Sequence, residues 1–346
     1  MSYLVKGKPF VFKGTIDVSD CETAAEVMKK ASLDWTVAKT KVYAEMPFIE
    51  DSAKNSDTFI QGADIYTSIN NAYAIYRTDK NIPLGLVKSQ YTPVQNIEAF
   101  NFFDNAIGKD KAIFQTAGCF GFGERIFVSV KLPNDILVNG DPVENYLVFT
   151  TSHDGSSGVK ILFTPIRVVC ENTLNAAIQN TSNYVSFKHS KNVHYNIDIA
   201  SEILGICKTK SNNLQLEYEA MAKLPVKDRD AKQIFAEVVF TEDELNKIKN
   251  NGNTLDEILS RNYIACTDNN LSMKKINTFI AIVNYYNTGI GQKEILGTQW
   301  GVYNAISGYY SNVFNVDSYK RMDSLLYGYG ADKIKLGGNI ITSLAS

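Results

Sequence analysis

The sequence predicts an α+β fold, with an antiparallel sheet in the N-terminal and central part and a mainly helical C-terminal half. Two observations support this class. Segments with the two-residue alternation of strands recur through 71–169, and from Glu171 onward the apolar spacing is helical. Strands that precede a run of helices indicate an antiparallel sheet, because a doubly wound sheet needs the two to alternate. We therefore expect an α+β domain at 1–192 and a helical region at 193–346 packed on it.

Short elements are expected in the N-terminal third. They are a strand or strand pair at 1–16, an extended segment at 33–46, a polar loop at 50–64, and strands at 71–78 and 83–88 joined by a turn at 78–81. Ser19 and Glu22 have the spacing of a capping box, which predicts a short helix ending near Ala31.

Three helix-start signals follow these strands. Thr92 can cap a helix, Pro93 suits the first helical position, and Gln95 completes a capping box. The apolar spacing continues helical to a glycine, so we expect this helix to end at Gly108.

The central part predicts four more strands, at 112–118, 125–132, 146–151 and 159–169. Glycines between the first two do not form a dinucleotide-binding motif, because they lead into a strand and not a helix. Asn139–Asp141 is a turn signal. The connection Ser152–Gly158 is long for a hairpin and rich in small polar residues, which marks it as a candidate functional loop.

The C-terminal half predicts helices joined by short polar connections. They are expected at 172–178, at 197–222 with a possible break at 211–213, after the capping boxes that begin at Thr241 and Thr254, at 272–286 and at 298–314. Residues 328–338 are expected to be loop-like and then weakly extended.

Composition limits the function classes. The 346 residues carry 35 basic and 37 acidic side chains, and a net charge of −2 argues against a wholly basic nucleic-acid coat while allowing a local basic groove. Five scattered cysteines without a CxxC pair indicate neither a zinc ribbon nor a disulfide framework. Neither a signal peptide nor a membrane span is apparent. We expect a soluble, cytoplasmic protein with no membrane contact, metal or cofactor.

Arg167 is the sharpest single residue, because it stands inside an otherwise apolar strand. A buried arginine needs partners. One interpretation is a structural ion pair, with Glu171 or Asp154 as the expected partner. Alternatively it contacts an anion near the N-terminus of a helix beginning at about Asn172, where free backbone N–H groups favour phosphate.

Basic and aromatic residues interleave along the central strands. The set proposed to bind nucleic acid comprises Arg167, Arg125, Lys131, Lys160, Tyr146 and Phe149. Cations that neutralise phosphate beside rings that stack on bases are typical of single-strand binding. The alternative is an ordinary half-buried sheet with aromatic residues inside and lysines outside.

Two further groups of residues are weaker candidates. Ser152, His153 and Asp154 are adjacent, and triad residues converge from distant positions, so we favour His153 and Asp154 as possible ligand contacts at a loop tip over a hydrolase site. Trp300 and Asn304 lie four residues apart on one helical face, where core packing is the simpler interpretation.

These motifs together resemble a known family. The residues that carry the resemblance are Thr92, Gln95 and Asn96, then the Ser152–Ser156 segment, then Thr164 to Leu174 with Arg167 and Asn172, and finally Trp300 and Asn304. In this order they resemble the phage/plasmid-like protein family, domain-of-unknown-function family 932, over roughly residues 30 to 315. No catalytic motif comes with the resemblance. It implies a bacteriophage or plasmid setting inside a bacterial cell.

The order of elements from Asn96 to Ile178 also resembles, coarsely, the core of phage single-strand annealing proteins. We therefore expect a non-enzymatic, homo-oligomeric protein that binds DNA, preferably single-stranded DNA, and acts in recombination or replication. The alternative is a virion or anti-defence protein that binds a host or phage protein. An enzyme that uses the His153 loop and Cys170 is the least supported, because no spaced catalytic constellation is present.

Overall fold

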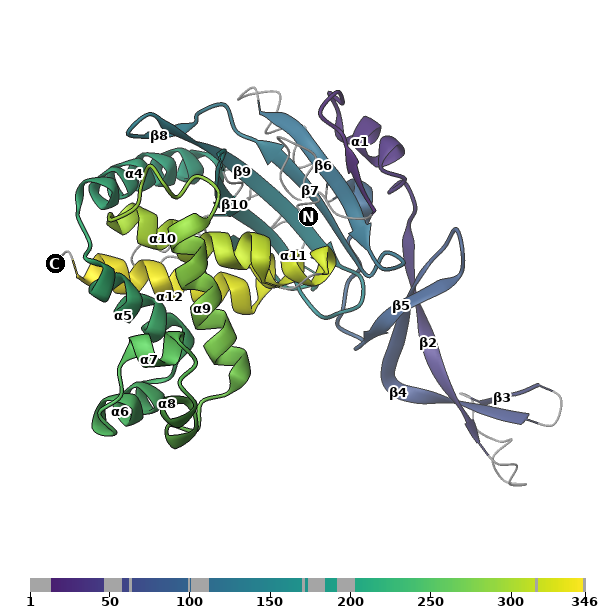
Figure 1. Ribbon diagram of the computed structural model, residues 1–346. Helices are drawn as coiled ribbons and strands as arrows, with labels where there is room; N and C mark the ends of the chain where they lie inside the picture. The colour runs from purple at the N-terminus through teal and green to yellow at the C-terminus, as the bar shows by residue number, and fades with distance from the viewer. Residues whose placement is uncertain are drawn as a thin grey trace.

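A computed structural model describes residues 14–46, 58–61, 64–98, 100, 112–169, 172–173, 184–191, 203–314 and 317–344. Two antiparallel sheets occupy the N-terminal and central part, and helices make up the C-terminal half (Figure 1). The α+β prediction is confirmed. The expected domain boundary at 192/193 lies outside the described residues.

The larger sheet has eight strands among the described residues. Its main order is β1 (Thr15–Asp17), β6 (Ile113–Phe120), β7 (Arg125–Lys131), β9 (Asp141–Ser152), β10 (Val159–Arg167) and β11 (Asn172–Thr173), while β8 (Ile136–Val138) pairs with β9 and β12 (Tyr184–Phe187) with β10. Every pairing is antiparallel. Short connections between sequential strands account for the order from β6 to β10, and the predicted turn at residues 139–140 joins β8 to β9.

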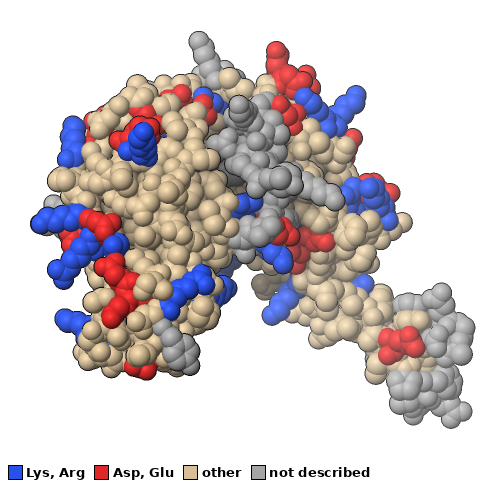
Figure 2. Space-filling model, viewed as in Figure 1, with Lys and Arg blue, Asp and Glu red and all other residues tan. Residues whose placement is uncertain are grey.

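The smaller sheet forms an arm that projects from the body of the molecule (Figure 1). It consists of β2 (Val37–Met46), β4 (Asp64–Arg77) and β3 (Thr58–Gln61), with β5 (Ile82–Val87) also paired to β4. Charges of both signs are interspersed over the helical half in the view of Figure 2, whereas the described part of the arm is mostly uncharged.

Helices cover both faces of the larger sheet. The described helices are α1 (Ala24–Lys30), α4 (Ile203–Lys223), α5 (Asp228–Val239), α6 (Glu242–Asn250), α7 (Leu255–Leu259), α8 (Tyr263–Asp268), α9 (Met273–Thr288), α10 (Gln299–Gly308), the π-helical turn η3 (Tyr309–Val313), α11 (Ser318–Tyr327) and α12 (Tyr329–Ser343). The capping boxes at Thr241 and Thr254 are confirmed in α6 and α7.

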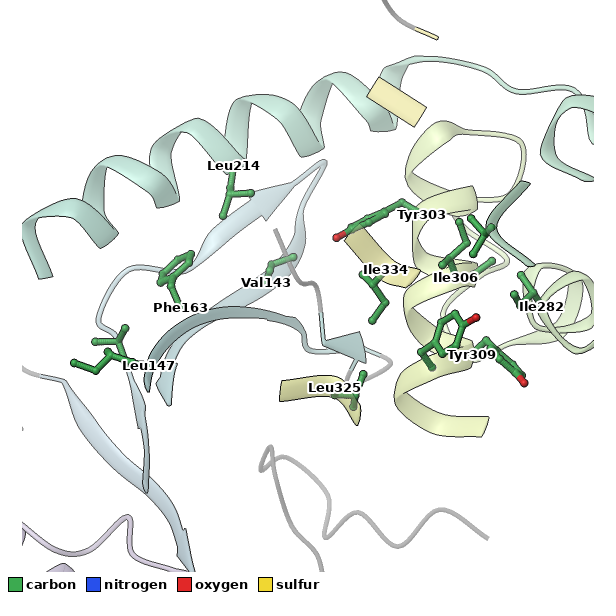
Figure 3. Close-up of a cluster of buried hydrophobic side chains, with 14 of the residues drawn as sticks. Val143, Leu147, Phe163, Leu214, Ile282, Tyr303, Ile306, Tyr309, Leu325 and Ile334 are labelled. Atoms are coloured by element: carbon green, nitrogen blue, oxygen red, sulfur yellow. The ribbon is translucent and has the colours of Figure 1, made fainter. Parts of the chain in front are cut away.

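One sheet face belongs to the main hydrophobic core. Leu214 of α4 lies over Phe163 and Leu147, and the same core continues to Tyr303 and Ile306 of α10 (Figure 3). We call this the core face. The opposite face carries a smaller apolar cluster in which α11 packs on the sheet, and we call it the α11 face. Its cluster is Phe120, Phe127, Val148 and Leu162 of the sheet with Met322 and Leu326 of α11.

Several local predictions were wrong in detail. The first helix is capped by Thr23, whose hydroxyl accepts from the N–H of Glu26, while Ser19 bonds to Asp17 instead. The expected loop at 50–64 contains β3, and residues 47–57 and 62–63 lie outside the described residues. Residues 211–213 do not interrupt α4.

The expected helix at Thr92 begins later. Helical backbone starts at Asn96, and residues 91–95 are irregular. Gln95 does not return to Thr92, because its amide bonds to the backbone of Val37 on another strand. A tertiary partner therefore displaces the local cap, and the expected end at Gly108 lies outside the described residues.

Residues 328–338 were expected to be loop-like, yet they lie in α12. Gly337 and Gly338 are buried in this helix. A Cβ at Gly337 would crowd the side chain of Ile306 on α10, so the glycine permits close helix packing. Packing overrides the low helix propensity of glycine here. In the described part of the chain no helix is long and apolar enough to span a membrane.

Candidate nucleic-acid interface

Strand pairing decides which candidate side chains share a face. Phe127 lies opposite Thr150, and Thr150 lies opposite Lys160, so their side chains point to the same side. Arg125 and Lys131 join them because each is an even number of residues from Phe127. The three cations therefore lie on the α11 face.

Arg167 lies on the opposite face and is buried, with 2% of its surface exposed. Its Nε donates to the carboxylate of Asp141, and its Nη1 donates to the carbonyl of Gly291 at 3.0 Å. The expected ion pair exists, but its partner is Asp141 and neither Glu171 nor Asp154. A guanidinium enclosed in this way has no surface toward a phosphate.

The anion site expected beside Arg167 is also corrected. Asn172 and Thr173 form β11 and pair with Arg167 and Ile166 of β10. A helix N-terminus does not begin at Asn172, so free helical N–H groups are not offered there. Residues 174–178 of that expected helix lie outside the described residues.

Both candidate stacking rings are inside the protein. Tyr146 is 1% and Phe149 is 0% exposed, and the hydroxyl of Tyr146 donates to Glu144. Lys131 contacts the same Glu144 at 2.5 Å and Asp135 at 3.6 Å. Tyr146 and Phe149 therefore belong to the sheet interior, and Lys131 is paired with acidic side chains. The sequence alternation did not distinguish this arrangement from an exposed surface.

Arg125 and Lys160 lie at the other end of the α11 face, where loops from both sheets meet. The guanidinium of Arg125 donates to the hydroxyl of Ser156 at 3.0 and 3.2 Å. Ser156 is exposed in the loop between β9 and β10, and both cations are half-exposed. Lys188 follows β12 and is exposed. We call this region the loop end.

A tight turn between β6 and β7 presents an aromatic ring at the loop end. The carboxylate of Glu124 accepts the backbone N–H groups of Phe122 and Gly123 at 2.6 and 3.1 Å. Positive φ angles at Gly121 and Gly123 permit the turn. Phe122 is left 64% exposed. Sequence reasoning missed this ring, although glycines on both sides of a phenylalanine were visible.

His153 was expected at a loop tip but is completely buried. Its Nε2 lies 2.9 Å from Oδ1 of Asn96, whose amide nitrogen donates to the carbonyls of Leu33 and Trp35 at 2.8 and 3.3 Å. These two hydrogen bonds fix the orientation of the Asn96 amide, so its oxygen faces His153. Because an amide oxygen only accepts, Nε2 of His153 is the donor. Burial is the main cause that lowers the pKa of His153 to about 3. His153 therefore anchors the loop from within.

Asp154 stays near the surface and shapes the loop. Its carboxylate accepts the N–H of Ser156 at 2.9 Å and the hydroxyl of Ser156 at 2.5 Å. Ser156 thereby links Asp154 to Arg125. Among the described residues, no cluster of three or more His, Cys, Asp or Glu side chains is placed to hold a metal ion.

A second buried histidine supports the same junction. His189 stacks on Tyr91 at 4.5 Å between ring centroids and bonds to Thr151 and to the carbonyl of Thr92. Tyr91 donates to the carbonyl of Ser152 at 2.7 Å. The pKa of His189 is lowered to about 4, and burial is the main cause of this shift.

Trp35 and Arg77 complete the junction between arm and body. The Arg77 guanidinium lies 4.3 Å over the Trp35 ring, pairs with Asp79 at 2.7 Å and donates to the carbonyl of Phe122 at 2.7 Å. Trp35 meets His153 edge-on at 5.3 Å. The neighbouring motif residues Gln95 and Asn96 bond to the backbone of residues 33–37, and His153, which is 57 residues from Asn96, bonds to the Asn96 side chain, so these residues join segments that are distant in sequence.

Gly85 on β5 of the arm lies close to the β9–β10 loop. A Cβ there would overlap the backbone of Asp154. We predict that Gly85→Ala destabilises the protein by about 1 to 3 kcal/mol, because backbone and not a flexible side chain must move. Urea unfolding measures this. Leu86→Ala, at a neighbouring position that is 69% exposed, should change stability far less, and equal effects of the two changes would contradict the contact.

The tryptophan motif is core. Trp300 is 1% exposed and packs on Tyr218 at 4.8 Å between ring centroids. Asn304 is fully buried, and its amide donates to the carbonyl of Trp300 at 2.9 Å within the same helix. The core interpretation of both residues agrees with this placement.

Comparison with known proteins places most of the chain in one family. A family model described as "Domain of unknown function (DUF932)" matches residues 83–326. This range contains the Gln95–Asn96, His153 and Trp300 motifs. No curated protein and no solved structure matches the chain.

Proposed function

The chain belongs to this family of unknown function, and from its geometry we propose that it is a non-enzymatic protein that binds single-stranded DNA through the loop end. The observation that carries the proposal is that Arg125 and Lys160, on one sheet face, lie at the same end as the exposed ring of Phe122. Cations that bind phosphates and a ring that stacks on bases are the two parts of a single-strand site.

Rigidity of the loops supports the proposal. The Phe122 turn is held by Glu124 and by Arg77, and the Ser156 loop is held by Asp154 and by buried His153. Loops whose backbone is already held in place lose little conformational freedom on binding. The DNA contacts predicted for Arg167, Tyr146 and Phe149 are not part of this proposal, because these side chains are buried.

We place this binding in recombination or replication of a phage or plasmid. The setting follows from the motif resemblance, and the annealing role from the coarse order of elements. Neither assignment requires a cofactor. Both require contact with the sugar-phosphate backbone without strong base preference, which a sheet end with two cations and one ring suits.

Fluorescence anisotropy with labelled single- and double-stranded DNA at several salt concentrations tests the proposal. We predict that Arg125→Ala and Lys160→Ala each weaken single-strand binding and reduce the salt slope by about one. Phe122→Ala should weaken binding about 5- to 100-fold without changing the slope, because it removes stacking alone.

Lys247→Ala is the matched control, since Lys247 is exposed on α6 in the helical half. It should bind like the wild type. Absence of wild-type binding at low salt would overturn the proposal, and so would equal losses at Lys247 and Arg125, which would indicate nonspecific attraction.

A further inference from the structure

Lys188 is an exposed cation at the loop end. It follows β12 directly, and within the described part of the chain it forms no ion pair. We propose that Lys188 is a third phosphate contact of the single-strand site, and that the bound strand runs across the larger sheet from Phe122 to Lys188. This inference rests on the proposed function and adds the path and the length of DNA that the site takes.

Strand pairing and burial place Lys188 on the α11 face. Ser186 of β12 lies opposite Lys160 of β10, so these two side chains point to the same side of the sheet. Phe187 packs against the main core, and His189 is buried. Ser186 and Lys188, which alternate with them, are exposed. The alternation of a strand thus continues just beyond β12, and Lys188 shares a face with Lys160.

The backbone beside Lys188 is held by His189. The His189 ring stacks on Tyr91 at 4.5 Å between centroids, and its two nitrogens lie 3.2 Å from the hydroxyl of Thr151 and from the carbonyl of Thr92. The N–H of Thr92 donates to the carbonyl of His189 at 3.1 Å. Because this backbone is already in place, binding through Lys188 costs little ordering of the chain.

The three cations stand on different strands, and their order defines a path. β7, β9, β10 and β12 are successive neighbours in the sheet. Arg125 begins β7 opposite Ser152 of β9, Lys160 is the second residue of β10, and Lys188 follows β12. Neighbouring strands are about 4.8 Å apart, so about 14 Å separates Arg125 from Lys188 across the sheet. Phe122 lies in the turn before β7 and therefore at the far end of the path from Lys188.

The length of this path indicates the substrate. About 14 Å corresponds to about four nucleotides at the ~3.4 Å rise of one strand in duplex DNA, and to fewer in a stretched strand. Three cations on the path suit three phosphates of one short segment. A base must leave its stack to meet the Phe122 ring, which a single strand permits at low cost. The site therefore takes a single-stranded stretch of about 3 to 5 nucleotides, lying across the sheet strands.

Fluorescence anisotropy with labelled oligothymidylates of increasing length, at several salt concentrations, tests the inference. The affinity of the wild type should rise steeply up to about five nucleotides and only slowly beyond that length. Lys188→Ala should weaken binding of a long oligonucleotide about 3- to 10-fold and reduce the salt slope by about one. The steep rise should also end about one nucleotide earlier, because one end of the path is lost.

Lys131→Ala is the matched control. Lys131 lies on the same face as Arg125 but at the other end of β7, about 20 Å from the loop end, and it is paired with Glu144. This variant should bind like the wild type at every length. Lys188→Arg keeps the charge and should also bind like the wild type, whereas Lys188→Glu should lose more affinity than Lys188→Ala.

The outcomes separate this inference from the proposed function. If Arg125→Ala weakens binding while Lys188→Ala matches the wild type at every length and salt concentration, the third contact is wrong and the proposed function stands. Equal losses in Lys188→Ala and Lys131→Ala would also overturn the path, because they would indicate nonspecific attraction. A wild type that binds no single strand overturns both. Unchanged thermal unfolding midpoints distinguish loss of binding from loss of folding.

Discussion

Replacing Arg167 by methionine is expected to destabilise the protein by about 3 to 5 kcal/mol, the cost of breaking a buried ion pair from one side. The change leaves the carboxylate of Asp141, whose side chain is 15% exposed, without its guanidinium. It also leaves the carbonyl of Gly291 without its donor. Urea unfolding at neutral pH followed by circular dichroism measures the loss.

Two further variants serve as controls for the Arg167→Met result. The double variant R167M/D141L removes both charges and should recover much of the stability, because an apolar pair can replace a buried ion pair. Arg125→Met makes the same chemical change at a half-exposed site and should stay within about 0.5 kcal/mol of the wild type. A stable Arg167→Met protein that lost DNA binding would instead make Arg167 a ligand contact.

Acid is expected to weaken the junction between arm and body through His153. Its pKa is about 3 in the folded protein because of burial, against 6.5 for an ordinary histidine. Between these values the unfolded chain binds more protons, so stability falls as pH falls. Protonation of His153 on unfolding should therefore lower the free energy of unfolding by about 3 kcal/mol between pH 7.5 and pH 4.

The measurement is the free energy of unfolding of the wild type and of His153→Gln across this pH range. Glutamine can still donate to Asn96 but does not titrate, so the difference between the two proteins should shrink as pH falls. His189, with a pKa of about 4, also lowers the free energy of unfolding as pH falls. Glu217 has the opposite effect on the free energy of unfolding, because burial raises its pKa to about 7.

The contributions of His189 and Glu217 are present in the wild type and in His153→Gln, so they cancel when the two proteins are compared. A difference that stays constant from pH 7.5 to pH 4 would show that His153 is charged, or accessible to water, in the folded state. That outcome would also remove the buried histidine as the anchor of the β9–β10 loop.

Local sequence signals determined much of the fold. Residue alternation predicted β2, β6, β7, β9 and β10, and the capping boxes at Thr241 and Thr254 predicted α6 and α7, because these signals act within a few residues. The family resemblance also came from the sequence, and residues 83–326 confirm the family. The phage or plasmid setting stays a prediction.

Tertiary structure alone decided the identity of partners and the exposure of each candidate. Alternation placed Tyr146 and Arg125 on one face, yet only packing buries the first and leaves the second half-exposed. Gln95 caps a strand edge and not its own helix, and Arg167 pairs with Asp141, which is 26 residues away. Such contacts form between elements distant in sequence, so short-range patterns carry no information about them.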